Sequence, residues 1–113
     1  MTDVRVASAL SAPELASVTA LIHRVTNADG LSPLSEHALL HLHRGADIRS
    51  IHLLAYEEDE LVGYAHLDVT DEVAGPSAEI AVAPEYRRAG IGRALVQAML
   101  DRSIQACLRQ GKY

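Results

Sequence analysis

The sequence predicts one α/β domain in which a strand and two helices are followed by three strands and a third helix. Three observations lead to this prediction. The chain has 113 residues, which is enough for one hydrophobic core and short for two domains. Apolar residues recur at helical spacing in two long segments, one in each half of the chain. Between these segments lie short apolar and β-branched runs separated by turn residues, which is the pattern of strands.

The first half begins with a strand predicted at residues 4–8. Ser11 is expected to cap the helix that follows, because Glu14 stands at the capping-box position. Apolar residues at three- and four-residue steps carry this helix to about residue 26, and the turn residues "NADG" are expected to end it. Residues 33–44 predict a second, shorter helix that ends at Gly45.

The second half begins with a hairpin, predicted from two apolar runs at residues 51–56 and 61–67. The four acidic residues "EEDE" between them are expected to form a solvated tip that discourages aggregation. The segment "AEIAVAP" predicts a fourth strand that is stopped by Pro84. A third helix is expected from Gly90 onward, with its apolar stripe at Ile91, Leu95, Ala98 and Met99.

Composition excludes several classes of protein. The net charge of -5, from 10 basic and 15 acidic residues, argues against a nucleic-acid-binding surface. No apolar run approaches the roughly 20 residues of a membrane span, and the first residues lack the pattern of a signal peptide. Cys107 is the single cysteine and cannot form an internal disulfide, so we expect a cytoplasmic protein.

The hinge "RRAGIG", residues 87–92, carries the most specific chemistry in the chain. A helix N-terminus offers unpaired N–H groups and a partial positive charge, and flanking glycines let a phosphate reach them. The hinge therefore predicts an anion cradle, with a tight turn bearing solvated arginines as the alternative. The dinucleotide-binding fingerprint needs a glycine where Leu95 stands, and a P-loop needs Gly-Lys-Ser/Thr where residues 92–94 stand. Both of these motifs are excluded.

A strand that leads into Arg-x-x-Gly-x-Gly, after this order of elements, resembles the acetyl-CoA signature of the GNAT-type N-acetyltransferases. Longer segments such as "HLLAYEEDELVGYAHLD" and "AEIAVAPEYRRAGIGRAL" resemble the N-terminal half of the mycothiol synthases, over about residues 5–100. The resemblance implies a GNAT-like fold of order β-α-α-β-β-β-α. Residues 1–113 are then expected to form a single, partial domain without the C-terminal strands of that fold.

The resemblance also implies a function, acetyl-CoA-dependent N-acetyl transfer to the cysteinyl amine of a cysteine-glucosamine-inositol substrate. The residues whose backbone N–H groups are expected to hold the cofactor pyrophosphate are Arg87, Arg88, Ala89, Gly90, Ile91 and Gly92. Those expected to pair with pantetheine and the acetyl carbonyl are Ile80, Ala81 and Val82. Two alternatives stay open: a non-catalytic acetyl-CoA-binding half of a tandem protein, and a stand-alone enzyme acting on another amine.

Two carboxylates are candidates for the chemistry of the acceptor. Glu79 could deprotonate an ammonium beside the acetyl site, or it could face solvent or a basic neighbour. Glu36 matches an acidic residue that contacts the substrate in the family, and it could equally favour a helix N-terminus. His37 and His41 lie one helical turn apart, but a solvated face explains them better than a metal site, so no metal is expected.

The resemblance ends near residue 100, before the fifth strand of a GNAT domain. The fourth strand is therefore expected to present an unpaired edge, which predicts association there with a second copy or a partner domain. The fifth strand would also shape half of the pantetheine slot, so we expect weak cofactor binding by this chain alone.

Overall fold

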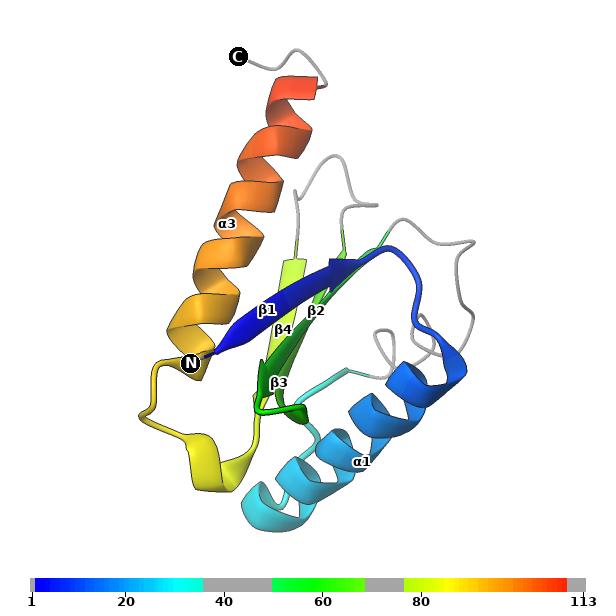
Figure 1. The fold of residues 1–113 in the computed structure, drawn as a ribbon, viewed down its shortest axis with the longest axis vertical. Coiled ribbons are helices and arrows are strands. Elements are labelled where there is room, and N and C mark those ends of the chain that lie inside the picture. The colour runs from blue at the N-terminus through cyan, green and yellow to red at the C-terminus, as the bar shows by residue number, and fades with distance from the viewer. Residues whose placement is uncertain (1, 36–49, 69–76, 110–113) are drawn as a thin grey trace.

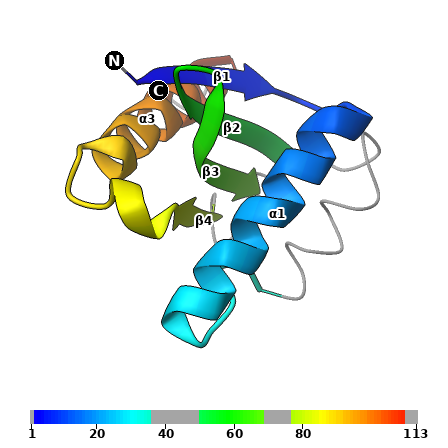
Figure 2. The same ribbon diagram turned by 60° about the horizontal axis from the view of Figure 1, so that its bottom comes forward.

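The computed structural model describes residues 2–35, 50–68 and 77–109. They form a four-stranded antiparallel sheet of order β1-β2-β3-β4 with one helix on each face (Figures 1 and 2). The strands are β1 (Asp3–Ala7), β2 (Ser50–Glu57), β3 (Glu60–Asp68) and β4 (Ser77–Val82), and the helices are α1 (Ala12–Asp29), the short 3-10 helix η1 (Pro84–Tyr86) and α3 (Ile91–Arg109). In this part of the chain no helix has the length and apolar character needed to cross a membrane.

The order of these elements agrees with the predicted one. The exception is the helix expected at residues 33–44, because residues 33–35 lie in a loop and the rest falls outside the described residues. At the edge of the sheet, β4 pairs with β3 on one side. No other described strand pairs with β4, so the predicted association through this edge stays a prediction.

Helix α1 begins as predicted and ends three residues later than predicted. Ser11 and Glu14 form both halves of the capping box: Ser11 N–H donates to the Glu14 carboxylate at 2.8 Å, and Glu14 N–H donates to Ser11 Oγ at 3.3 Å. The helix continues through Asp29 because the left-handed backbone occurs only at Gly30, whose φ is 76°. The N–H of Gly30 donates to the carbonyl of Thr26 at 2.8 Å, which closes the helix.

The hairpin of β2 and β3 turns more tightly than the acidic run suggested. Glu57 and Glu60 pair within the strands, and only Glu58 and Asp59 form the turn, with φ values of 50° and 73°. Two successive positive φ values are typical of the two-residue turns that match strand twist. The register then shifts, since Tyr56 pairs with Leu61 whereas Ala55 pairs with Gly63. One extra residue in β3 therefore makes a bulge that sets which side chains share a face.

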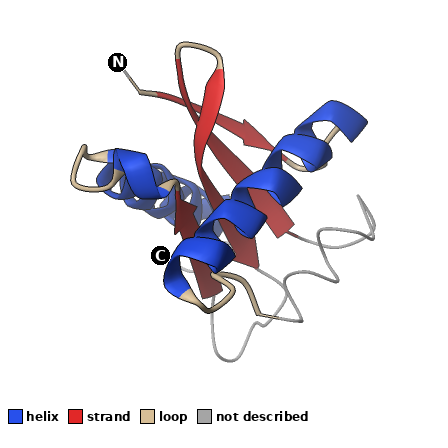
Figure 3. Cartoon of the chain, turned by 90° about the horizontal axis from the view of Figure 1, so that it is seen from below, coloured by secondary structure: helices blue, strands red, loops and turns tan. Residues whose placement is uncertain are grey.

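Gly63 allows α3 to pack closely on the sheet. A Cβ at this position would lie 2.7 Å from Cγ2 of Ile91 and 3.1 Å from Cδ1 of Leu95, both on α3. Alternation along the strands therefore places Ala65, Ile80 and Val82 on the α3 face. The residues that alternate with these along each strand, such as Tyr64 and Ala81, lie on the face that carries α1. Figure 3 shows the two helices on opposite sides of the strands. The described core is built from Leu, Val, Ile and Ala together with Met99 and one fully buried Tyr, Tyr64.

Candidate functional site

A pocket of about 280 Å³ lies where β4, η1 and α3 meet. Pro84 ends β4, and η1 turns the chain with hydrogen bonds from Tyr86 N–H to the Ala83 carbonyl at 2.9 Å and from Arg87 N–H to the Pro84 carbonyl at 3.5 Å. The lining residues are Val82, Tyr86, Arg87, Arg88, Gly90, Ile91, Gly92 and Arg93. The pocket thus joins the last residue of β4 to the loop that the sequence predicted as an anion cradle.

The backbone of residues 88–93 is shaped to present N–H groups. Arg88 and Gly90 have φ values of 65° and 86°, whereas Ala89 between them has no positive φ. Such an alternation is typical of concave nests of N–H groups that bind anions. The first hydrogen bond of α3 runs from Ala94 N–H to the Gly90 carbonyl at 3.0 Å. The N–H groups of residues 91–93 precede this bond, and in a helix such groups lack an intrahelical acceptor.

Gly92 faces open space. A Cβ placed on it would meet no atom of the described residues within 4 Å, and its φ is not positive. Neither packing nor backbone conformation therefore requires glycine at this position, although glycine costs about 1 kcal/mol relative to alanine within a helix. A side chain at position 92 would instead fill the pocket that this residue lines. The site fits a ligand whose phosphates must approach the helix N-terminus closely.

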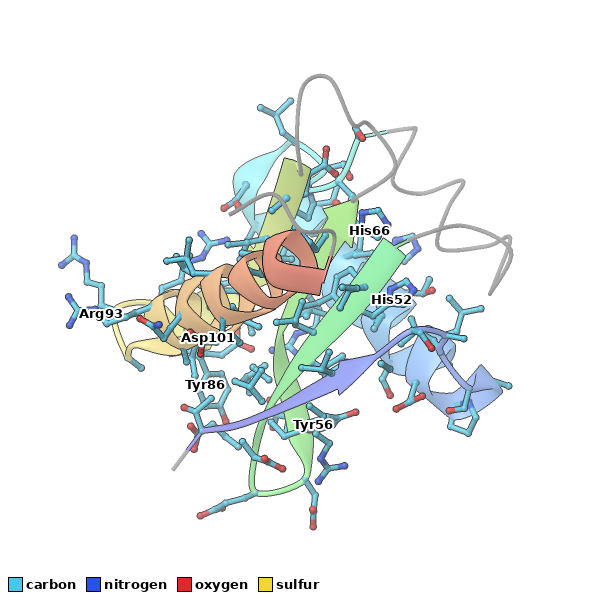
Figure 4. The ribbon with its side chains drawn as sticks, turned by 90° about the horizontal axis from the view of Figure 1, so that it is seen from above. His52, Tyr56, His66, Tyr86, Arg93 and Asp101 are labelled. Atoms are coloured by element: carbon cyan, nitrogen blue, oxygen red, sulfur yellow. The ribbon has the colours of Figure 1, made fainter. Side chains whose placement is uncertain are left out.

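The arginines of the loop have different roles. The guanidinium of Arg87 makes two hydrogen bonds of 2.8 Å to the two carboxylate oxygens of Asp29, at the end of α1. This ion pair lowers the pKa of Asp29 and raises that of Arg87, in each case chiefly through the side-chain hydrogen bonds. Arg88 and Arg93 are exposed and line the pocket, and Figure 4 shows Arg93 extending outward near the N-terminal end of α3. The Arg87 side chain is thus engaged within the protein, which the sequence did not predict.

The three residues of β4 that are predicted to contact pantetheine direct their backbone groups to different sides of the strand. Ala83 N–H donates to the Val62 carbonyl on β3 at 2.8 Å. Because backbone groups alternate sides along an antiparallel strand, Ala81 also directs its N–H and C=O toward β3. Ile80 and Val82 direct theirs to the opposite side, away from β3. Outward-facing groups for a ligand are therefore available at Ile80 and Val82 and not at Ala81, which corrects the prediction at that residue.

Glu79 is held by the loop that follows α1. Its carboxylate accepts a hydrogen bond from Ser35 N–H at 2.8 Å, and its side chain is half-buried. It pairs in register with His66, so its side chain lies on the α1 face and not on the face that carries α3. The structure thus gives Glu79 a backbone partner in the loop after α1 and places His66 opposite it on β3. Glu36, predicted to contact the substrate, lies outside the described residues.

Two histidines and a tyrosine form a buried polar cluster that the sequence did not predict. His52 Nδ1 lies 2.7 Å from the hydroxyl of Tyr64, and the His52 and His66 rings are 5.7 Å apart between centroids (Figure 4). Burial, with a smaller effect of His66, lowers the pKa of His52 to about 4. Burial also raises the pKa of Tyr64, with a smaller effect of Glu79. This cluster lies across β2 and β3, next to Glu79 on β4.

No group of three metal-binding side chains occurs among the residues that the structure describes. His37 and His41, whose spacing raised the question of a metal, fall outside these residues, as does the side chain of Cys107.

Known proteins resemble this chain in both sequence and fold. Residues 49–112 match the family described as "Acetyltransferase (GNAT) domain". A mycothiol acetyltransferase of Streptosporangium roseum is 48% identical over 90 residues, which are 80% of this chain and 27% of that protein. The mycothiol acetyltransferase of Acidothermus cellulolyticus is 49% identical over 92 residues, 79% of this chain and 28% of that protein. The chain therefore spans less than a third of the length of these relatives.

A solved structure supports the fold independently. The ribosomal-protein-S18-alanine N-acetyltransferase of Escherichia coli superposes with a TM-score of 0.70 at 20% identity, covering 94% of this chain and 61% of that one. An identity this low indicates the fold alone. The fold, the matched segment and the identity to curated relatives together confirm the predicted resemblance. The chain belongs to the GNAT acetyltransferase family.

Proposed function

We propose that this chain binds acetyl-CoA in the pocket between β4 and α3 and serves N-acetyl transfer to a small amine. The observation that carries the proposal is Gly92, a helical glycine that neither packing nor backbone conformation requires and that lines a pocket beside exposed N–H groups. The pyrophosphate of the cofactor needs such a surface, because a Cβ there would keep it from the helix N-terminus. Family membership supports the same cofactor.

The chain's own groups have separate tasks in this proposal. The N–H groups of residues 88–93 would bind the pyrophosphate, while Arg88 and Arg93 add positive charge at the rim of the pocket. The outward-facing groups of Ile80 and Val82 would orient the pantetheine arm and donate to the carbonyl oxygen of the acetyl group. When bound, acetyl-CoA supplies the activated acetyl thioester.

Among the described residues, Glu79 is the candidate general base. Its carboxylate would take a proton from the ammonium of the acceptor, directly or through a water molecule. The hydrogen bond from Ser35 N–H fixes the orientation of this carboxylate. A Glu79→Gln variant should keep acetyl-CoA affinity within about twofold and lose roughly 100-fold or more in kcat, if the chain has turnover.

The acceptor class follows from the relatives. The two curated relatives are named mycothiol acetyltransferases, so we propose the cysteinyl amine of a cysteine-glucosamine-inositol compound as the acceptor. A second function stays a candidate, because the matched segment is 27% and 28% of those relatives and their activity need not belong to this segment alone. It is a cofactor-binding unit that packs on a catalytic domain and has no turnover by itself.

Calorimetric titration of the chain with acetyl-CoA tests the proposal. Saturable binding should be lost in Gly92→Glu, which places both bulk and negative charge in the pocket. Leu100→Glu is the matched control, because Leu100 is a 52% exposed residue of α3 that does not line the pocket and lies about two helical turns beyond Gly92. It adds the same charge to the same helix and should leave the affinity unchanged.

Three results separate the possibilities. Binding by the wild type that Gly92→Glu removes and Leu100→Glu retains supports the cofactor site. Turnover with the cysteinyl amine then distinguishes the enzyme from the cofactor-binding unit. Absence of any heat at millimolar acetyl-CoA, with the chain folded, would contradict the proposal.

A further inference from the structure

Two ion pairs connect the last turns of α1 to η1 and to the loop at residues 87–92, called the arginine loop below. Arg24 pairs with Glu85 of η1, and Asp29 pairs with Arg87 directly after η1. The signs alternate, since each segment contributes one acid and one base. The Asp29 pair is bidentate, because two guanidinium nitrogens of Arg87 each donate to one carboxylate oxygen at 2.8 Å. In this geometry even an exposed ion pair fixes the relative orientation of its two side chains.

Asp29 is unfavourable for α1 itself. It is the last residue of the helix, where the backbone carbonyls carry partial negative charge, and the last turn contains no basic residue. A carboxylate at this position destabilises an isolated helix. Its contact with Arg87, 58 residues away in the sequence, compensates for this effect. A local preference that is violated in favour of one long-range contact points to a role for that contact beyond the helix.

The arginine loop needs such support. Arg88 holds a left-handed φ of 65° without being glycine, and it directly follows the paired Arg87. A residue in this conformation costs roughly 1 kcal/mol or more, so the surrounding structure must hold it there. Fixing the Arg87 side chain on α1 constrains the residue that precedes the strained one and hence the direction of the N–H groups at residues 88–93.

We infer that the Asp29–Arg87 pair is a positioning clamp, in which Arg87 orients the loop through α1 and does not serve as a phosphate ligand. The effect of the clamp on acetyl-CoA affinity rests on the proposed function, whereas its effect on the loop can be measured without the cofactor. The two interpretations of Arg87 predict opposite changes in anion affinity when the Asp29 carboxylate is removed. If Arg87 contacted phosphate, removing its counter-ion would free a guanidinium and tighten the binding of an anion. If Arg87 positions the loop, the same change weakens binding.

Hydrogen exchange of the free chain is the first test. In Asp29→Asn, the hydrogen-bonded amides that flank the loop, Tyr86, Arg87 and Ala94, should exchange roughly twofold to fivefold faster than in the wild type, as expected for losing one well-formed exposed ion pair. The amides of the β2–β3 hairpin should be unchanged, which separates loop motion from global unfolding. Asp29→Glu keeps the carboxylate and should stay close to the wild type. Unchanged exchange of these flanking amides in Asp29→Asn, or a Glu variant as fast as the Asn variant, would overturn the clamp.

The affinity for acetyl-CoA is the second test. Asp29→Asn should raise the Kd roughly twofold to fivefold, although it makes the site more positive by one charge. Asp101→Asn removes the same charge ten residues along α3, about 15 Å from the start of that helix, and should leave the Kd unchanged. Tighter binding by Asp29→Asn would overturn the clamp. If the wild type does not bind acetyl-CoA, the proposed function fails, and the exchange experiment alone decides the clamp.

Discussion

Gly63→Ala tests whether close contact between α3 and the sheet sets the geometry of the pocket. The added Cβ would lie 2.7 Å from Cγ2 of Ile91 and 3.1 Å from Cδ1 of Leu95. Both side chains are almost fully buried, with exposed fractions of 1% and 0%. Carbon atoms pack at about 3.5–4.0 Å, so α3 must move by roughly 1 Å at its first residue.

Two opposing effects set the free-energy cost of this movement. Overpacking a core costs about 1–3 kcal/mol, whereas replacing glycine by alanine in a compatible backbone returns about 0.4–1 kcal/mol. A net loss of about 1–2 kcal/mol is expected, or a fall in Tm of about 5–10 °C for a chain of this size. Because Ile91 directly follows Gly90 of the arginine loop, the same movement should also weaken acetyl-CoA binding.

Chemical denaturation of two further variants checks the reasoning. Gly92→Ala makes the same substitution where no atom lies within 4 Å, so its free energy of unfolding should rise by up to about 1 kcal/mol. Adding Ile91→Leu to Gly63→Ala removes the branched methyl group that clashes and should recover part of the loss, measured as a coupling energy. A Gly63→Ala variant as stable as the wild type would refute the close packing on which the pocket depends.

Three other predictions concern stability and affinity. Ser11→Ala removes the N-cap of α1 and should cost about 1 kcal/mol in urea unfolding, whereas Ser11→Asp should cost little. The lowered pKa of His52, about 4 against an ordinary 6.5, means that the unfolded chain binds a proton more readily than the folded one. Stability should therefore fall as the pH drops from about 6.5 toward 4, by about 2 kcal/mol between pH 7 and pH 5, and His52→Gln should flatten this dependence in urea titrations at several pH values. Gly92→Ala should bind acetyl-CoA at least tenfold more weakly by calorimetry while being no less stable, and equal affinity would count against the pocket.

Much of the fold could be predicted because local signals agree with the final structure. The capping box at Ser11, the acidic hairpin tip and Pro84 after β4 each determine an element boundary through contacts within a few residues. The sequence predicts the end of α1 too early, because polar residues such as Asn27 and Asp29 do not stop a helix by themselves. The helix ends where the backbone becomes left-handed at Gly30, and Asp29 in its last turn pairs with Arg87.

The sequence predicts the loop backbone of the candidate site but does not predict the contacts that its side chains make. The loop at residues 87–92 was recognisable from glycine and arginine spacing, but the partner of Arg87 lies 58 residues away. The pairing of His52 with His66 depends on the bulge that follows Leu61, and a regular hairpin from the same turn would have put His52 opposite Ala65. Such contacts depend on register and tertiary packing, which spacing in the sequence does not specify.

In the proposed site, backbone N–H groups at the junction of β4 and α3 bind the phosphates of acetyl-CoA. A titration with acetyl-CoA, followed by amide chemical shifts in NMR, examines these groups one by one. The largest shifts are expected at residues 88–93, with further shifts at Ile80 and Val82 and small ones at Ala81. Saturating shifts that leave residues 88–93 unchanged, or no shifts at millimolar acetyl-CoA, would contradict the proposed site.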